Sequence, residues 1–314
     1  MTTGTTFRNQ LNSFHPLTQL AFLVGICVVF SIVFSMLAMP LVYQFWDINI
    51  LTDYGALEDH SNPNAIAATR LLMLFSHLGT FVVPALLFAF LMHRNVPAYF
   101  KMNRAHHISQ WFYLIPIMVL ALPIIHFFHE WNQHMELPEF LSGLEATMKQ
   151  LEETSMKTTM ALLKSDSTGT WLANMVVIAI VPAIGEELIF RGVVQKLFVK
   201  WSKNIHLGIW LAAILFSVMH MQFYGFIPRM LMGALLGYIF VYSGSIFLPM
   251  LAHFFNNGFV VTLHYLIGDA EKVEEVENVA MGTEHEWLSL LITTVLFVLF
   301  FFPFWKRRKP LHLD

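Results

Sequence analysis

Several ionisable side chains lie inside long apolar stretches of this 314-residue sequence. Glu186, Glu187 and Arg191 share one stretch, His220 lies in the next, and His253 lies in a third. Ionisable groups at membrane depth are costly, so they mark functional sites by default. Carboxylates and imidazoles exchange protons near neutral pH. The set therefore predicts general acid–base chemistry, such as the activation of a water molecule.

Helical spacing divides the carboxylate pair. Residues four apart in a helix lie on one face, whereas adjacent residues diverge by about 100°. Glu187 and Arg191 can therefore form an ion pair, which leaves Glu186 pointing elsewhere. We expect Glu187 to have a supporting role and Glu186 to act as the general base or acid.

The same spacing pairs residues in the other two stretches. Phe216 comes four residues before His220, and His253 comes four residues before Asn257. Each feature alone has a structural explanation: an ion pair for Glu187 and Arg191, a buried histidine for His220, and a helix–helix hydrogen bond for His253 and Asn257. Their occurrence in three segments favours one site in which a carboxylate and two imidazoles converge on a water. His77, in an earlier apolar segment, shows no evident partner and is interpreted as a core or interfacial residue.

The composition places this site in a membrane protein. The chain is 56% hydrophobic and 12% charged, with a mean hydropathy of +0.60, whereas soluble domains have about 25% charged residues. The lone Cys27 excludes an intrachain disulfide and a Cys-rich zinc site. The sequence contains no phosphate-binding glycine loop or H-E-x-x-H zinc motif, and nothing indicates nucleic acid. We interpret residues 1–314 as a single membrane domain.

About eight segments are apolar over the roughly 20 residues that a spanning helix needs. The predicted all-α spans are residues 17–45, 68–93, 110–128, 171–197, 206–224, 227–245, 247–267 and 287–305. Residues 171–267 would form the catalytic core. Residues 139–164 repeat apolar positions with a helical period, which predicts either an amphipathic helix on the outer surface or an ordinary solvated helix.

Loop charges predict the orientation, because basic residues stay on the cytoplasmic side. The basic positions are Arg8, Arg94, Lys101, Arg104, Lys196, Lys200, Lys203 and Lys306 to Lys309, and the acidic ones in alternate loops include Glu271, Glu274, Glu275 and Glu277. Both termini should therefore be cytoplasmic. The first apolar run is too long for a signal-peptide core and is interpreted as a retained anchor. We expect a multi-pass protein of the cell (inner) membrane.

Three motifs resemble those of a known family. They read Glu186-Glu187-Leu-Ile-Phe-Arg191, Phe216-Ser-Val-Met-His220 and His253-Phe-Phe-Asn-Asn257. In this order the chain resembles the CAAX protease and bacteriocin-processing family of intramembrane proteases, which includes the type II CAAX prenyl endopeptidases. The resemblance covers about residues 175–260, and the N-terminal half is consistent only in hydropathy.

The resemblance implies an endopeptidase for protein or peptide substrates that enter from the bilayer, some of them lipid-modified. Glu186 and His220 would activate the attacking water. His253 and Asn257 would stabilise the oxyanion, each donor contributing roughly 3 to 4 kcal/mol. Arg191 would help to hold the site together.

Two questions stay open at this level. One concerns a cofactor: either none is needed, or Glu186, His220 and His253 form a two-histidine, one-carboxylate zinc site with Glu187 as the base. The other concerns the class of protein. A transporter or ion-translocating protein would also carry buried charges, although no inverted repeat is evident. A non-catalytic immunity or scaffold relative would keep the same fold.

Overall fold

A computed structural model describes residues 11–93, 95–103, 109–269, 272–273 and 286–306. The described residues are helical and include no strand. The helices are α2 (Pro16–Trp46), η1 (Tyr54–Glu58), α3 (Pro63–His77), η2 (Leu78–Val82), α4 (Val83–Met92), α5 (Val96–Tyr99), α6 (Ser109–Gln133), η3 (Glu139–Leu141), α7 (Ser142–Leu163), α8 (Thr168–Asn174), η4 (Met175–Ile180), α9 (Val181–Ile189), η5 (Phe190–Val194), α10 (Gln195–Ser202), α11 (Ile205–Met219), α12 (Phe226–Ser243), α13 (Phe247–Ile267) and α15 (Glu286–Lys306).

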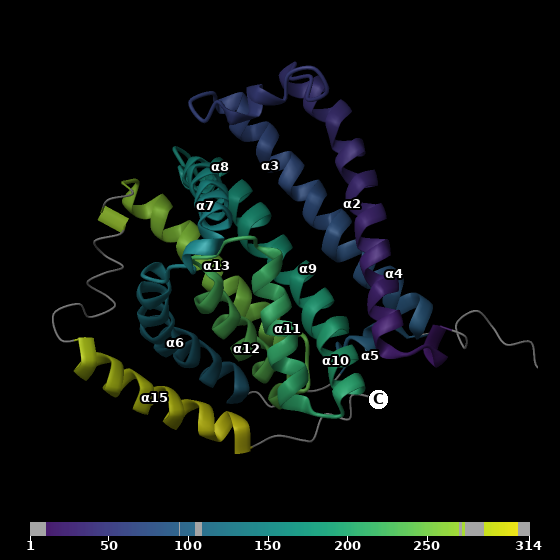
Figure 1. Ribbon diagram of the computed structural model, residues 1–314, viewed down its shortest axis with the longest axis vertical. Helices are drawn as coiled ribbons and strands as arrows, with labels where there is room; N and C mark the ends of the chain where they lie inside the picture. The colour runs from purple at the N-terminus through teal and green to yellow at the C-terminus, as the bar shows by residue number, and fades with distance from the viewer. Residues whose placement is uncertain (1–10, 94, 104–108, 270–271, 274–285, 307–314) are drawn as a thin grey trace, which may run out of the picture.

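The helices form one bundle around the segments that carry the three motifs. Helices α9 to α13 occupy its middle, α2 packs against α3 on one flank, and α15 packs against α6 on the other (Figure 1). Large apolar side chains on α2, such as those of Val28, Val29 and Met36, are exposed. An extended exposed apolar surface of this kind is suited to lipid contact.

Among the described residues, five helical stretches are long and apolar enough to cross a membrane: Pro16–Trp46, Pro63–Met92, Ser109–Gln133, Thr168–Ser202 and Phe226–Ser243. The span predicted at 206–224 is shorter, because α11 ends at Met219 after 15 residues. That length is about 22 Å, against a hydrocarbon core of about 30 Å. Helix α15 is 21 residues long, and α13 carries the polar residues of the third motif.

The count of eight spans and the cytoplasmic termini stay predictions. Many of the charged residues behind the predicted orientation lie outside the described residues: Arg8, Arg94, Arg104, Arg307, Arg308, Lys309, Glu271, Glu274, Glu275 and Glu277. Helix α7 lies in the range of the predicted amphipathic helix, and its placement on the membrane surface also stays a prediction.

Two long helices change pitch near the carboxylate pair. Residues 168–202 run through the π-helical segments η4 and η5, which flank the α9 turns carrying Glu186 and Glu187. Residues 63–92 contain a third π-helical segment, η2, directly after His77. Pro84 and Pro182 each follow one of these segments. Because proline removes a backbone donor and clashes with the preceding turn, a local change of pitch accommodates it. Single π-helical turns are frequent at functional sites.

A glycine allows these two irregular helices to approach each other closely. A Cβ added at Gly185 would lie 2.9 Å from Cβ of Phe81 and 3.0 Å from Cγ2 of Val82. Only the absence of a side chain permits this distance. The contact brings the end of α3, with His77, next to the turn of α9 that carries Glu186.

We predict that Gly185→Ala destabilises the protein by about 1 to 3 kcal/mol, the usual cost of overpacking. Gly25→Ala in α2 is the matched control, because a Cβ there would meet nothing within 4 Å and alanine favours a helix. Thermal unfolding of both variants in the same detergent measures the difference. Equal melting temperatures for the two variants would contradict the close packing of α9 against η2.

Candidate active site

The most buried carboxylate of the site, Glu187, is ion-paired as predicted. Its Oε1 accepts a hydrogen bond from the Arg191 guanidinium at 2.6 Å, and the two residues are 0% and 1% exposed. The same Oε1 lies 2.9 Å from Nδ1 of His253. One carboxylate oxygen therefore joins a residue of η5 to a residue of α13.

Arg191 connects this pair to two further helices. Its second terminal nitrogen donates to the backbone carbonyl of Gly233 in α12 at 2.9 Å. Its guanidinium carbon lies 5.0 Å from the ring centroid of Phe216 in α11, which is a cation–π contact. Buried charges are stable only when they are paired and hydrogen-bonded, and these contacts supply that pairing.

Phe216 is the aromatic centre of the site. Besides Arg191, its ring contacts His220 edge to face at a centroid distance of 4.8 Å and His253 at 6.1 Å. Phe190 packs on it at 5.1 Å. The Phe-x-x-x-His spacing therefore places the imidazole of His220 edge to face against a ring that also packs against the ion pair.

The hydrogen bonds of His253 determine where its proton lies. A carboxylate that is ion-paired with arginine only accepts hydrogen bonds, so Nδ1 of His253 must carry the hydrogen that faces Glu187. The opposite nitrogen, Nε2, lies 3.8 Å from Oε2 of Glu186. In the neutral ring Nε2 holds a lone pair. His253 can therefore donate to an oxyanion from Nε2 only after it has taken up a proton.

Glu186 differs from its neighbour in its partners. It is 5% exposed, and within the described residues it pairs with no Lys or Arg. Its Oε1 lies 3.6 Å from Nε2 of His77, and it is within electrostatic reach of His77, His220 and His253. Sequence reasoning missed His77: the interpretation that it has no specific partner is wrong. Its position as a histidine inside an apolar span was the available indication.

The tautomers of all three imidazoles follow the same rule. Nδ1 of His77 lies 3.0 Å from the Met73 carbonyl, and Nδ1 of His220 lies 2.8 Å from the Phe216 carbonyl. Carbonyl oxygens only accept, so both Nδ1 atoms carry hydrogens and both Nε2 atoms hold lone pairs. The ionised carboxylate of Glu186 and the Nε2 lone pairs of the three imidazoles around it can therefore only accept hydrogen bonds. A further proton, or a water that donates its hydrogens, is needed between them.

His220 itself lies at the C-terminal end of α11, where the chain turns toward α12. Its ring makes no hydrogen bond or ion pair with Glu186 in the described structure. The following turn is held by α7, because Glu152 accepts from the Tyr224 backbone at 3.0 Å and Glu145 accepts from the Tyr224 hydroxyl at 3.1 Å. A hydrogen bond from Lys149 holds the pKa of the Glu145 carboxyl below its usual range, so this acceptor stays ionised at neutral pH.

Asn257 forms its hydrogen bonds with partners other than the two carboxylates. Its amide nitrogen donates to the Ile178 carbonyl of η4 at 3.0 Å, and its oxygen accepts from Asn256 at 3.1 Å. Within the described residues it has no hydrogen bond to Glu186 or His253. The side chain thus stabilises the π-helical segment, and one of its two amide hydrogens is left for another acceptor.

The zinc alternative stays a prediction. Across the part of the chain that the structure describes, no group of three or more His, Cys, Asp or Glu side chains is arranged to hold a metal ion. Glu186, His220 and His253 are neighbours without converging on one coordination point.

We predict that breaking the buried pair is costly and that removing both charges is less so. Arg191→Met leaves Glu187 buried without its cation and should destabilise by about 3 to 5 kcal/mol. Glu187→Gln with Arg191→Met should recover part of that loss, because neither charge is then left alone. Unfolding in a defined detergent tests Arg191→Met, Glu187→Gln and the double variant. A double variant whose loss equals the sum of the single losses would contradict the pairing.

Comparison with known proteins finds a match over the helices that carry the three motifs. Residues 168–259 match the family model described as type II CAAX prenyl endopeptidase Rce1-like. The uncharacterized protein YpbD of Bacillus subtilis (strain 168) is 30% identical over 87 residues, which are 26% of this chain and 41% of that relative. The match therefore spans less than half of the curated relative. No solved structure matches.

The matched range includes all three motifs and excludes His77. This match, together with several apolar helices of spanning length, points to a multi-pass membrane protein. Residues 168–259, and with them the helices of the candidate site, are therefore similar to the Rce1-like family of type II CAAX prenyl endopeptidases.

Proposed function

We propose that this chain is an endopeptidase of the cell (inner) membrane that hydrolyses peptide bonds of membrane-associated or lipid-modified substrates. The observation that carries the proposal is the contrast between two adjacent buried carboxylates. Glu187 is neutralised by Arg191 at 2.6 Å, whereas Glu186 faces imidazole nitrogens at 3.6 and 3.8 Å. A buried carboxylate without a cation partner is suited to take a proton from water.

In the proposed reaction, a water bound beside Glu186 attacks the carbonyl carbon of the peptide bond. Its proton passes to Glu186, with His220 as a second acceptor, and is later delivered to the leaving amine. His253 takes a proton from solvent at Nε2 before the water attacks and keeps it through the reaction, and Glu187 stabilises the resulting positive charge at Nδ1. The attack leaves a negative charge on the carbonyl oxygen of the substrate. The Nε2–H of His253 and the remaining amide hydrogen of Asn257 can both donate hydrogen bonds to this oxyanion. These roles follow the general logic of an oriented imidazole.

An apolar groove beside the site supports lipid-modified substrates. A cavity of about 380 Å³ lies between α2, η2, η5 and α11, and its lining includes Leu23, Cys27, Phe81, Phe190 and Leu215. Phe81 packs on His77 at a centroid distance of 5.6 Å, and Phe190 packs on Phe216. A lipid chain in this groove would place the attached peptide next to Glu186.

Glu186→Gln should abolish cleavage, with a fall of at least about 100-fold, because the amide cannot accept the proton. His77→Gln should lower kcat about tenfold, since it removes one partner of Glu186 while leaving the carboxylate. The assay is cleavage of a library of membrane-anchored and lipid-modified peptides by the full chain in liposomes. Glu153→Gln, an exposed Glu on α7, is the matched control.

The protease proposal would be contradicted if Glu186→Gln cleaved the peptides at the wild-type rate. It would also be contradicted if neither the wild type nor any variant cleaved a peptide of the library. In the second case, cation flux through the same liposomes that depends on Glu186 would favour an ion-translocating protein. A folded chain with neither activity would favour an immunity or scaffold protein.

Leu215→Trp should fill the groove and raise KM for lipid-modified peptides about tenfold, which equals the loss of about 60 Å² of apolar contact at ~25 cal/mol per Å². Unmodified peptides should be cleaved as before. Leu207→Trp is the matched control, because Leu207 lies on the same helix but is exposed and outside the groove. An equal change for both kinds of peptide would show that the groove does not hold the lipid.

A further inference from the structure

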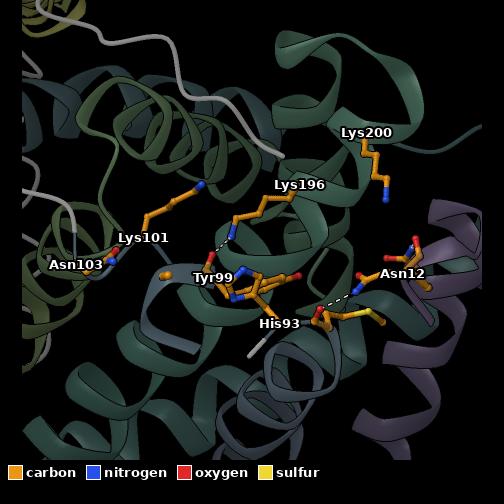
Figure 2. Close-up of a pocket in the computed structure, with 10 residues that line it drawn as sticks. Asn12, His93, Tyr99, Lys101, Asn103, Lys196 and Lys200 are labelled. Atoms are coloured by element: carbon orange, nitrogen blue, oxygen red, sulfur yellow. Dashed lines mark hydrogen bonds between the residues drawn. The ribbon is translucent and has the colours of Figure 1, made fainter. Parts of the chain in front are cut away.

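A second cavity, rich in nitrogen donors, lies at the far end of the helix that carries the carboxylates. Its volume is about 390 Å³, and Figure 2 shows the side chains around it. The lining residues come from the start of α2, the end of α4, α5 and α10: Asn12, Gln19, Met92, His93, Ala98, Tyr99, Lys101, Asn103, Lys196 and Lys200. Among the described residues, this lining includes three lysines and no Asp or Glu.

Lys196 is the buried cation of this cavity. The residue is 8% exposed, and its Nζ donates to the backbone carbonyl of Tyr99 (Figure 2). It also lies 4.3 Å from the ring centroid of Tyr99. No carboxylate of the described residues forms an ion pair with it. An ammonium has three hydrogens, so two are left without an anionic acceptor, and a buried charge in this state is costly.

The neighbouring lysines add to the positive potential. Lys200 lies one helical turn after Lys196 on the same face, and Lys101 is close enough to Lys196 for their charges to interact. Figure 2 shows the two on either side of Lys196. Like charges that share a cavity repel each other. A bound anion would reduce this repulsion and would accept hydrogen bonds from the ammonium of Lys196.

The location of the cavity points to the chemistry of the anion. Helix α2 begins at Pro16, α4 ends at Met92 and α10 ends at Ser202, so the cavity lies at the ends of membrane-spanning helices. Phospholipid phosphates occupy this depth. Basic pockets between spanning helices are suited to such head groups, and lysine binds phosphate as a point charge.

We propose that this cavity is a binding site for a phosphate group, carried either by an anionic phospholipid or by free phosphate. Lys196 is the central ligand, with Lys101 and Lys200 at the sides. The site is separate from the proposed catalysis, because none of its residues lies in the three motifs. Occupancy would fix α10 against α5 and the start of α2.

The full chain, purified in a neutral detergent at constant ionic strength, tests this site. It is titrated with short-chain phosphatidylglycerol, short-chain phosphatidylcholine or sodium phosphate, and binding is followed by calorimetry and by the shift in Tm. Binding of phosphatidylglycerol alone identifies the lipid, and binding of sodium phosphate as well shows that the free ion suffices. Phosphatidylcholine, which has no net charge, should not bind.

Lys196→Met should weaken binding about tenfold or more, because it removes a charge-assisted contact. Lys200→Gln, at an exposed position, is the second variant if Lys196→Met does not fold. Lys203→Asn is the matched control: it removes one charge at the same end of the bundle, outside the cavity, and asparagine tolerates the positive φ of 54° there. The proposal would be overturned if neither phosphatidylglycerol nor sodium phosphate bound to the protein. An equal loss of affinity in Lys203→Asn and Lys196→Met would also overturn it.

Discussion

The carboxylate of Glu187 is buried among four helical segments, and its charge has to be neutralised there. Arg191 supplies the positive charge at 2.6 Å, and the same guanidinium holds the Gly233 carbonyl of α12 and packs over Phe216 of α11. His253 of α13 reaches the same carboxylate oxygen. Because an unpaired charge at this depth would cost several kcal/mol, the pair sets the relative positions of the elements that carry the three motifs.

The chemistry of the site follows from this arrangement. With Nδ1 of His253 committed to Glu187, its Nε2 faces Glu186, and the carbonyls of Met73 and Phe216 impose the same tautomer on His77 and His220. Glu186 is therefore surrounded by groups that accept protons. Glu187 supports the site by orienting an imidazole as well as by neutralising Arg191, which makes its role wider than structural pairing alone.

Local spacing allowed the ion pair to be predicted, because Glu187 and Arg191 are one turn apart in the same helix. The contact between His77 and Glu186 was hidden, since it depends on a close approach at Gly185 that no periodicity reveals. The π-helical segments and the short α11 were missed for a similar reason: hydropathy reports apolar length, whereas proline and tertiary packing decide pitch and helix ends. Asn257 was correctly placed in its helix, but its partner, a backbone carbonyl, has no sequence signature.

The protonation of His253 tests this account most directly. Nitrogen-15 NMR of the full chain with labelled histidine, compared with His253→Asn, reports which ring nitrogen carries hydrogen. The account predicts a protonated Nδ1 that changes its shift in Glu187→Gln, with Nε2 unprotonated in the neutral ring. A neutral His253 with hydrogen on Nε2 and a bare Nδ1 would contradict the orientation by Glu187 on which the proposed site depends.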